Sequence, residues 1–174
     1  MPLHTEIPLL HGAWRIDRSR STVGFLIRHL GVATVRGSFA SFDGRIDDAD
    51  GHLRIAGRVD VASIDSGDEI RDRRLREEFF AADRFPAMSF DAVTAIPALV
   101  GSWNVEGELT IRDSTRPFAL TVTAETLDDS TVRLHANGRL TRSEFGLEWD
   151  ALKQAGRLLV ADHVRVYADV VLER

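Results

Sequence analysis

The chain has 174 residues, of which 44% are hydrophobic and 28% are charged, an ordinary balance for one globular domain with a substantial core. It contains no cysteine, which excludes disulfides, thiolate nucleophiles and cysteine-ligated metals. The formal net charge of −5 lacks the basic excess typical of nucleic-acid binding, and it disfavours electrostatic attachment to anionic membranes.

The first residues carry no hydrophobic pattern, and we expect a flexible tail over residues 1–12. This segment lacks the basic stretch and apolar run of a secretory signal. No run approaches the roughly 18 apolar residues that a transmembrane helix requires. The sequence therefore predicts a cytoplasmic protein without stable membrane insertion.

The ordered part begins with a short predicted strand at Trp14–Asp17, followed by an extended run from Ser21. The apolar face of that run carries Val23, Phe25 and Ile27, and His29 continues the same file. A further run ends near Asp43–Gly44, a residue pair typical of turns.

Six later segments alternate strictly between apolar and polar residues, which is the period of a strand with one buried and one wet face. Their apolar positions are Leu53, Ile55, Gly57, Val59 and Val61; Met88, Phe90, Ala92 and Ile96; Val105, Gly107, Leu109 and Ile111; Phe118, Leu120 and Val122; Val132, Leu134, Ala136, Gly138 and Leu140; and Val164, Val166, Ala168, Val170 and Leu172. Parallel strands are covered on both faces, so this alternation indicates an antiparallel sheet.

About eight such strands cannot remain one flat, half-exposed sheet, and the pattern favours an all-β, antiparallel, eight-stranded barrel. Gly57, Gly107 and Gly138 lie on the inward file of their strands. Inward glycines permit sharp coiling of a strand or leave space for a cavity, and the sequence leaves both interpretations open.

One segment is typical of a helix. Ser66 followed by Glu69 has the form of a capping box, and Pro86 returns the chain to an extended conformation. Leu75 and Phe79 share one helical face. We expect this short helix to close one end of the barrel.

These residues resemble the YceI-like family of polyisoprenoid-binding, lipocalin-like barrels. The resemblance covers residues 13–174 as one domain, and its motifs occur in order: Trp14–Asp17, Arg28–Gly31, Arg36–Phe39, Ser63–Gly67, Phe85–Pro86, Gly107–Ile111 and Arg142–Leu147. Ser66 stands where the family usually has threonine, and Asp113 where glycine is usual. The resemblance implies a lumen that takes an amphiphile with a long isoprenoid or acyl tail, such as a polyprenyl chain or an isoprenoid quinone, and implies no catalytic reaction.

We assign the ligand-binding wall and its polar end on this basis. The wall is expected to comprise Val23, Phe25, Ile27, Phe79, Phe80 and Phe90, and the polar end His29, Arg71 and Asp72. A buried set of His29, Arg71 and Asp72 would have to be mutually bonded, either to tie the helix to the barrel or to bind a head group. The arginines around the helix suit phosphate binding or, alternatively, a solvated helix end.

Catalysis is weakly supported. His29, Asp72 and Ser143 are the residue types of a nucleophilic triad, but Ser143 lies in no G-x-S-x-G turn. The six histidines lack metal-binding spacing. We expect no catalytic residue, no metal and no cofactor beyond a bound isoprenoid or fatty-acyl lipid.

Two other functions remain open at this stage. One is a lipid-modifying hydrolase or isomerase that uses the same cavity, and the other is a ligand-free structural module that pairs with itself or a partner through a strand edge. A lumen in which Val59, Leu109 and Leu134 meet across the axis would favour the second. The predicted partner is a small hydrophobic ligand, with a homodimer possible.

Overall fold

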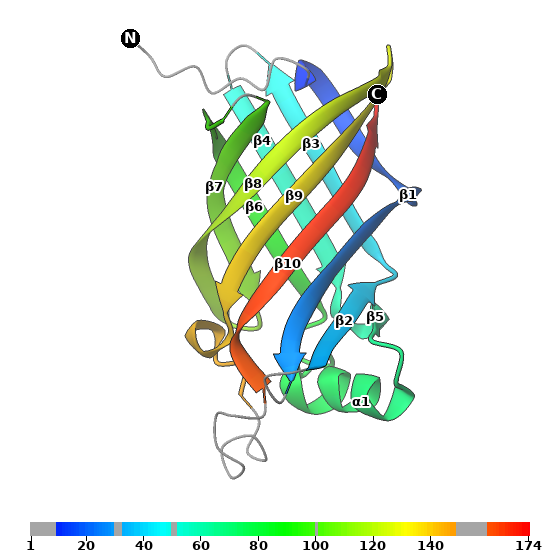
Figure 1. The fold of residues 1–174 in the computed structure, drawn as a ribbon, viewed down its shortest axis with the longest axis vertical. Helices are drawn as coiled ribbons and strands as arrows, with labels where there is room; N and C mark the ends of the chain where they lie inside the picture. The colour runs from blue at the N-terminus through cyan, green and yellow to red at the C-terminus, as the bar shows by residue number, and fades with distance from the viewer. Residues whose placement is uncertain (1–9, 30–32, 50–51, 100, 149–159) are drawn as a thin grey trace.

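The computed structural model describes residues 10–29, 33–49, 52–99, 101–148 and 160–174, which form ten strands and four short helical segments (Figure 1). The strands are β1 (Gly12–His29), β2 (Ala33–Phe39), β3 (Phe42–Ala49), β4 (His52–Asp60), β5 (Ile64–Asp65), β6 (Ala87–Pro97), β7 (Ser102–Ile111), β8 (Ser114–Asp128), β9 (Thr131–Thr141) and β10 (Val160–Glu173). The helical segments are η2 (Val61–Ser63), α1 (Glu69–Arg74), η3 (Leu75–Phe79) and η4 (Arg142–Phe145). None of the helices in these ranges is long and apolar enough to cross a bilayer.

The strands close into one antiparallel barrel. Their order is β10-β9-β8-β7-β6-β4-β3-β1-β2-β5, and β10 also pairs with β1. β2 and β3 act as one interrupted strand, because β2 pairs with Val23–His29 of β1 and β3 pairs with Gly12–Arg15. β5 is a two-residue extension on β2, so the closed wall has eight strands and the predicted fold is confirmed.

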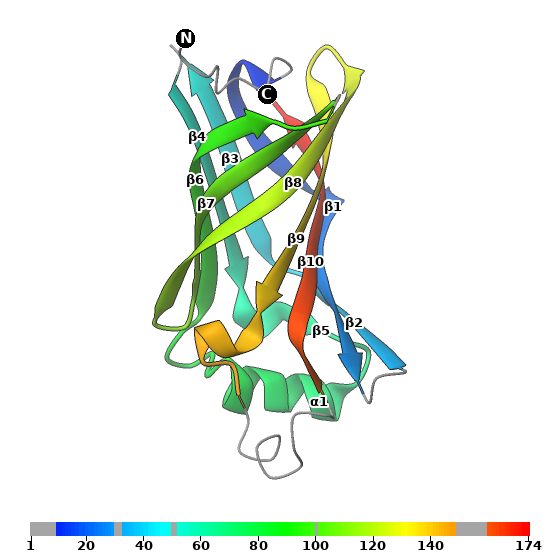
Figure 2. The same cartoon turned by 60° about the vertical axis from the view of Figure 1, so that its left-hand side comes forward.

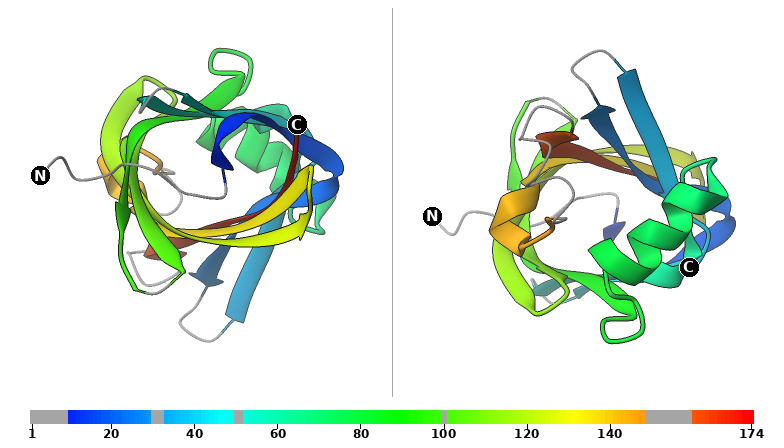
Figure 3. Two further views of the ribbon diagram at one scale, coloured as in Figure 1. Left: turned by 90° about the horizontal axis from the view of Figure 1, so that it is seen from above. Right: turned by 90° about the horizontal axis from the view of Figure 1, so that it is seen from below.

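The two ends of the barrel differ. The start of β1 and the end of β10 lie at one end, and α1 lies at the other together with η4, coloured orange (Figure 2). Seen along the barrel, α1 and η4 lie across part of that end, while the paired ends of β1 and β2 project from the wall (Figure 3). We call the end with α1 and η4 the helix end.

Inward side chains form two buried clusters. One includes Leu10, Trp14, Ile46, Leu53, Trp103, Val105 and Leu172. The other gathers residues from η2, η3, η4 and the strand ends beside them, including Phe39, Val61, Ile64, Phe79, Phe80, Phe145 and Leu147. The first cluster fills the end opposite the helices, which we call the closed end, and the second packs at the helix end.

Three predictions about local structure are wrong. Asp43 and Gly44 lie inside β3, and the chain instead breaks at Ala40–Ser41, where the Ala40 N–H donates to the Ser63 carbonyl. The expected Trp14–Asp17 strand is the start of one long strand, β1, with a register shift between Asp17 and Thr22. Ile96 was expected on the buried face of its strand. A bulge after Ala92 shifts the alternation by one residue, so that Ala95 is buried in its place.

The predicted flexible tail over residues 1–12 is wrong for its last residues. Leu10 is fully buried, and β1 begins at Gly12. The indole Nε1–H of Trp14 donates to the His11 carbonyl at 3.2 Å, which holds this segment against the closed end. Residues 1–9 lie outside the described part of the chain.

Candidate functional site: the barrel cavity

A cavity of about 640 Å³ lies inside the barrel. Its volume falls within the roughly 300–1,000 Å³ range of small-molecule sites. Val59, Leu109 and Leu134 line it from different strands and do not fill it. The filled lumen that would favour a ligand-free module is therefore not what the barrel contains.

The burial of inward side chains follows the cavity. Phe25, Ile27 and Phe90 point inward yet are only partly buried, because part of each side chain borders the cavity. At the closed end, Trp14 and Leu172 are almost completely buried. Apolar and polar residues alternate in the same way in both regions. The difference in burial therefore reflects which part of the barrel is filled with side chains and which part holds the cavity.

Glycines and phenylalanines alternate across part of the wall. Gly57 of β4 pairs with Phe90 of β6, and Gly107 of β7 pairs with Phe118 of β8, the next two strands around the barrel. The rings of Phe90 and Phe118 meet edge to face with centroids 6.0 Å apart, an arrangement that aromatic quadrupoles favour. A Cβ on Gly107 would lie 2.9 Å from Phe90 Cζ, and one on Gly138 would lie 2.6 Å from Phe118 Cζ.

These contacts decide between the two interpretations of the inward glycines. A Cβ at Gly138 would first meet the Phe118 ring. A Cβ at Gly107 would first meet the Asp91 carbonyl and then Ala92 Cβ at 2.7 Å, with the Phe90 ring next. Gly57 is different, because its nearest potential contact is the Phe90 carbonyl at 4.0 Å, and it borders the cavity. Close packing thus accounts for two of the glycines and open space for the third.

The cavity reaches solvent at the helix end. Asp68, Ile70, Arg71, Arg74 and Leu75 contribute to its lining from α1 and its flanks. Ile70 is 71% exposed, so an apolar side chain stands at the edge where the cavity meets water. The opposite end is sealed by the cluster that contains Leu10, Trp14 and Trp103.

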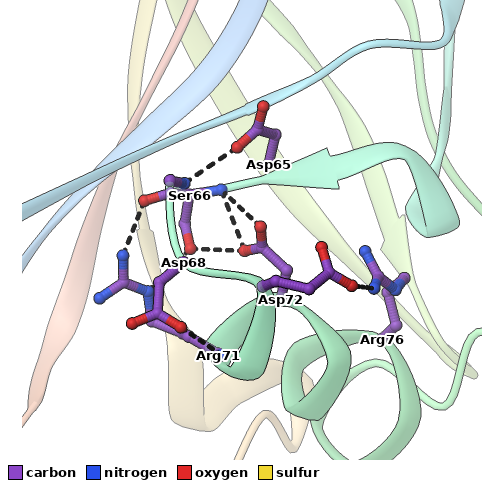
Figure 4. Close-up of polar contacts among 8 residues, drawn as sticks. Asp65, Ser66, Asp68, Arg71, Asp72 and Arg76 are labelled. Atoms are coloured by element: carbon purple, nitrogen blue, oxygen red, sulfur yellow. Dashed lines mark hydrogen bonds and ion pairs between the residues drawn. The ribbon is translucent and has the colours of Figure 1, made fainter.

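The start of α1 differs from the predicted capping box. Asp68 is the N-cap, and its side chain accepts from the Arg71 N–H at 3.0 Å. Ser66 lies two residues earlier, where its N–H donates to both oxygens of Asp72 and its Oγ donates to Asp72 Oδ1 at 2.5 Å (Figure 4). Glu69 accepts from Arg76 Nη2 at 2.8 Å.

This arrangement separates Asp72 from His29. Asp72 is only 4% exposed and lies outside the cavity lining, where it ties the segment before α1 to the helix. Arg71 joins the same hydrogen-bond network, because its Nε donates to Ser66 Oγ and its Nη2 donates to the Ser66 carbonyl, both at 2.7 Å. Within the described residues, no hydrogen bond or ion pair joins Asp72 to His29, so the expected set of three is replaced by Arg71, Ser66 and Asp72.

The other predicted site residues border the cavity. These are Val23, Phe25, Ile27, His29, Arg71, Phe79, Phe80 and Phe90. His29 ends β1 on the same side as the apolar file that precedes it. Their position makes them candidates for ligand contact.

The candidate triad is not assembled. Ser143 is exposed, and its Oγ donates to Asp162 Oδ2 at 2.7 Å, while Asp72 is bonded to Ser66. Burial alone would raise the pKa of Asp162, but the hydrogen bonds from Ser143 and the charge of Arg142 hold that pKa below its ordinary value. Among the described residues, no group of three or more His, Asp or Glu side chains is placed to hold a metal ion.

Sequence reasoning missed Arg142 as a site residue. It is 8% exposed and lines the cavity at the helix end. The signal was present in the alternation, because Arg142 comes two residues after Leu140 and so continues the inward file of β9. Most of the other missed lining residues, such as Val35, Leu109 and Phe118, belong to inward files in the same way.

Comparison with known proteins places this barrel among relatives. The family described as the YceI-like domain matches residues 14–172. A UPF0312 protein of Staphylococcus aureus (strain USA300) is 28% identical over 163 residues, which cover 87% of this chain and 92% of that protein.

Solved structures share the fold. Burkholderia cenocepacia BcnA has a TM-score of 0.81 at 23% identity, with 90% of this chain and 98% of that chain covered. A polyisoprenoid binding domain from Saccharophagus degradans, implicated in plant cell wall breakdown, has a TM-score of 0.76 at 14% identity, with 92% and 97% covered. The YceI protein of Campylobacter jejuni has a TM-score of 0.73 at 21% identity, with 91% and 96% covered.

Proposed function

Since the chain belongs to the YceI-like domain family, we propose that it binds an amphiphile with a long isoprenoid or acyl tail inside the barrel and carries or sequesters it. The observation that carries the proposal is the apolar cavity of about 640 Å³, sealed at the closed end and open at the helix end. A neighbour in fold described as a polyisoprenoid binding domain supports the same ligand class.

The energetics suit a tail-binding protein. Each buried methylene contributes about 0.8 kcal/mol, so about a dozen contribute roughly 10 kcal/mol before association costs are subtracted. A micromolar complex needs about 8 kcal/mol. An apolar wall therefore supplies most of the affinity, and the polar groups at the helix end orient the ligand.

Native mass spectrometry of freshly purified protein tests the proposal. We expect a population heavier than the bare chain, whose excess mass is released by organic extraction and identified as a lipid. The delipidated protein should then take up an added long-chain probe such as hexadecanol at one molecule per barrel. Bare chain only, with no uptake of the probe, would contradict the proposal.

A further inference from the structure

Arg142 places a buried positive charge in the lining of the cavity. It opens η4, directly after β9, and its side chain is 8% exposed. A guanidinium stays charged in proteins, and removal of a charge from water costs several kcal/mol unless partners compensate. The identity of those partners therefore determines what Arg142 can still bind.

The partners of Arg142 are all backbone carbonyls. Nη1 donates to the Leu147 carbonyl at 2.5 Å, Nε to that of Ala161 at 3.4 Å, and Nη2 to that of Val160 at 3.5 Å. These bonds use three of its five N–H groups, and two of them are long. Across the described ranges, no carboxylate lies within 4 Å of this guanidinium.

Two other arginines at the helix end, Arg71 and Arg74, have different bonding partners. Arg71 donates to both the hydroxyl and the carbonyl of Ser66. Arg74 is half exposed and pairs with Glu78 at 3.6 Å. Asp162 accepts from the backbone and the hydroxyl of Ser143, and the charge of Arg142 is among the causes that hold the pKa of Asp162 down. Among the described arginines that line the cavity at this end, Arg142 is thus the buried one, and its hydrogen bonds go only to backbone carbonyls.

We propose that Arg142 binds the anionic head group of the amphiphile, a carboxylate or a phosphate, while the tail extends toward Trp14 and Trp103 at the closed end. The inference rests on the proposed function and narrows its ligand class from amphiphiles in general to anionic ones. The free guanidinium donors suit oxyanions, and the low dielectric of the cavity strengthens such a bond. A neutral quinone or alcohol would offer the guanidinium no charge-assisted hydrogen bond.

A pair of ligands with one tail and different heads tests this assignment. Binding of hexadecanoate and of hexadecanol to delipidated protein is measured by isothermal titration calorimetry at pH 8, and hexadecyl phosphate is added as a second anion. Wild type should bind both anions more tightly than the alcohol. Arg142→Gln should weaken the anions about ten- to a hundredfold, the value of a charge-assisted bond, and leave hexadecanol within about twofold.

Hexadecanol binding by the variant also reports that the barrel has folded. Arg139→Gln is the matched control, since Arg139 is an exposed arginine of β9 outside the cavity lining, and it should keep the preference for anions. Equal affinity of wild type for hexadecanoate and hexadecanol would overturn the inference even if Arg142→Gln did not fold. A preference that survives in Arg142→Gln or disappears in Arg139→Gln would also overturn it. Failure of every ligand to bind wild type would instead contradict the proposed function.

Discussion

The ring of Phe118 occupies the space that a side chain at Gly138 would need, since a Cβ there would lie 2.6 Å from Phe118 Cζ. The two residues come from the neighbouring strands β8 and β9 and both face the lumen. The glycine thus lets the ring lie against the wall, and the cavity stays open beside it.

Gly138→Ala should therefore destabilise the barrel. The new methyl group would contact Phe118 and also Leu120 Cδ2 at 2.9 Å, and overpacking of this kind costs about 1–3 kcal/mol. Gly57→Ala is the matched control, because its Cβ would meet only the Phe90 carbonyl at 4.0 Å. Urea unfolding of both variants measures the difference. Equal loss of stability in the two would contradict the packing assignment.

A larger side chain in the lumen should block the proposed ligand. Leu109 lines the cavity from β7, and Glu108 faces outward beside it. We expect Leu109→Trp to weaken hexadecanol binding at least about tenfold, equal to 1.4 kcal/mol, because the indole occupies the tail's space. Glu108→Trp should leave calorimetric binding unchanged. If both variants bind as wild type does, the ligand lies elsewhere.

The bonds between Ser66 and Asp72 should stabilise the helix end. Asp72→Asn loses the charge that accepts from the Ser66 N–H and Oγ, and hydrogen bonds to charged groups contribute about 1.5–3 kcal/mol. Asp68→Asn is the control, since asparagine caps a helix about as well as aspartate. We expect thermal unfolding to show a clear loss of stability for the first variant and little for the second. A larger loss of stability in Asp68→Asn than in Asp72→Asn would show that the Asp68 N-cap is the main support of α1.

The bond between Ser143 and Asp162 should stabilise the fold in a pH-dependent way. The pKa of Asp162 is lowered in the folded chain, so its contribution is present above the unfolded value near 3.9 and is lost as the pH falls through the folded pKa. Ser143→Ala should therefore destabilise the protein at pH 7, by less than about 1 kcal/mol because water screens this exposed pair. The difference from wild type should shrink below about pH 4. Urea unfolding at pH 7 and pH 3.5 checks this, and a difference that grows in acid would contradict the assignment.

Part of the site follows from alternation alone. A strand has a period of two, so the file Val23, Phe25, Ile27 predicts that His29 faces inward, whereas Arg142, two residues beyond Leu140, was missed. The bulge after Ala92 interrupts one file and was invisible to this argument, because its extra residue is accommodated only by the pairing of β6 with β7.

The amino-acid sequence by itself determined the antiparallel barrel, the side on which most strand residues lie, and the presence of a short helix before Pro86. Only the tertiary structure decided that Ser66 donates hydrogen bonds to Asp72, that the Phe118 ring packs against Gly138, and that the buried Arg142 lines the cavity. The physical reason is that periodicity reports the environment of one strand, whereas partners and empty volume depend on side chains brought together from strands distant in the chain.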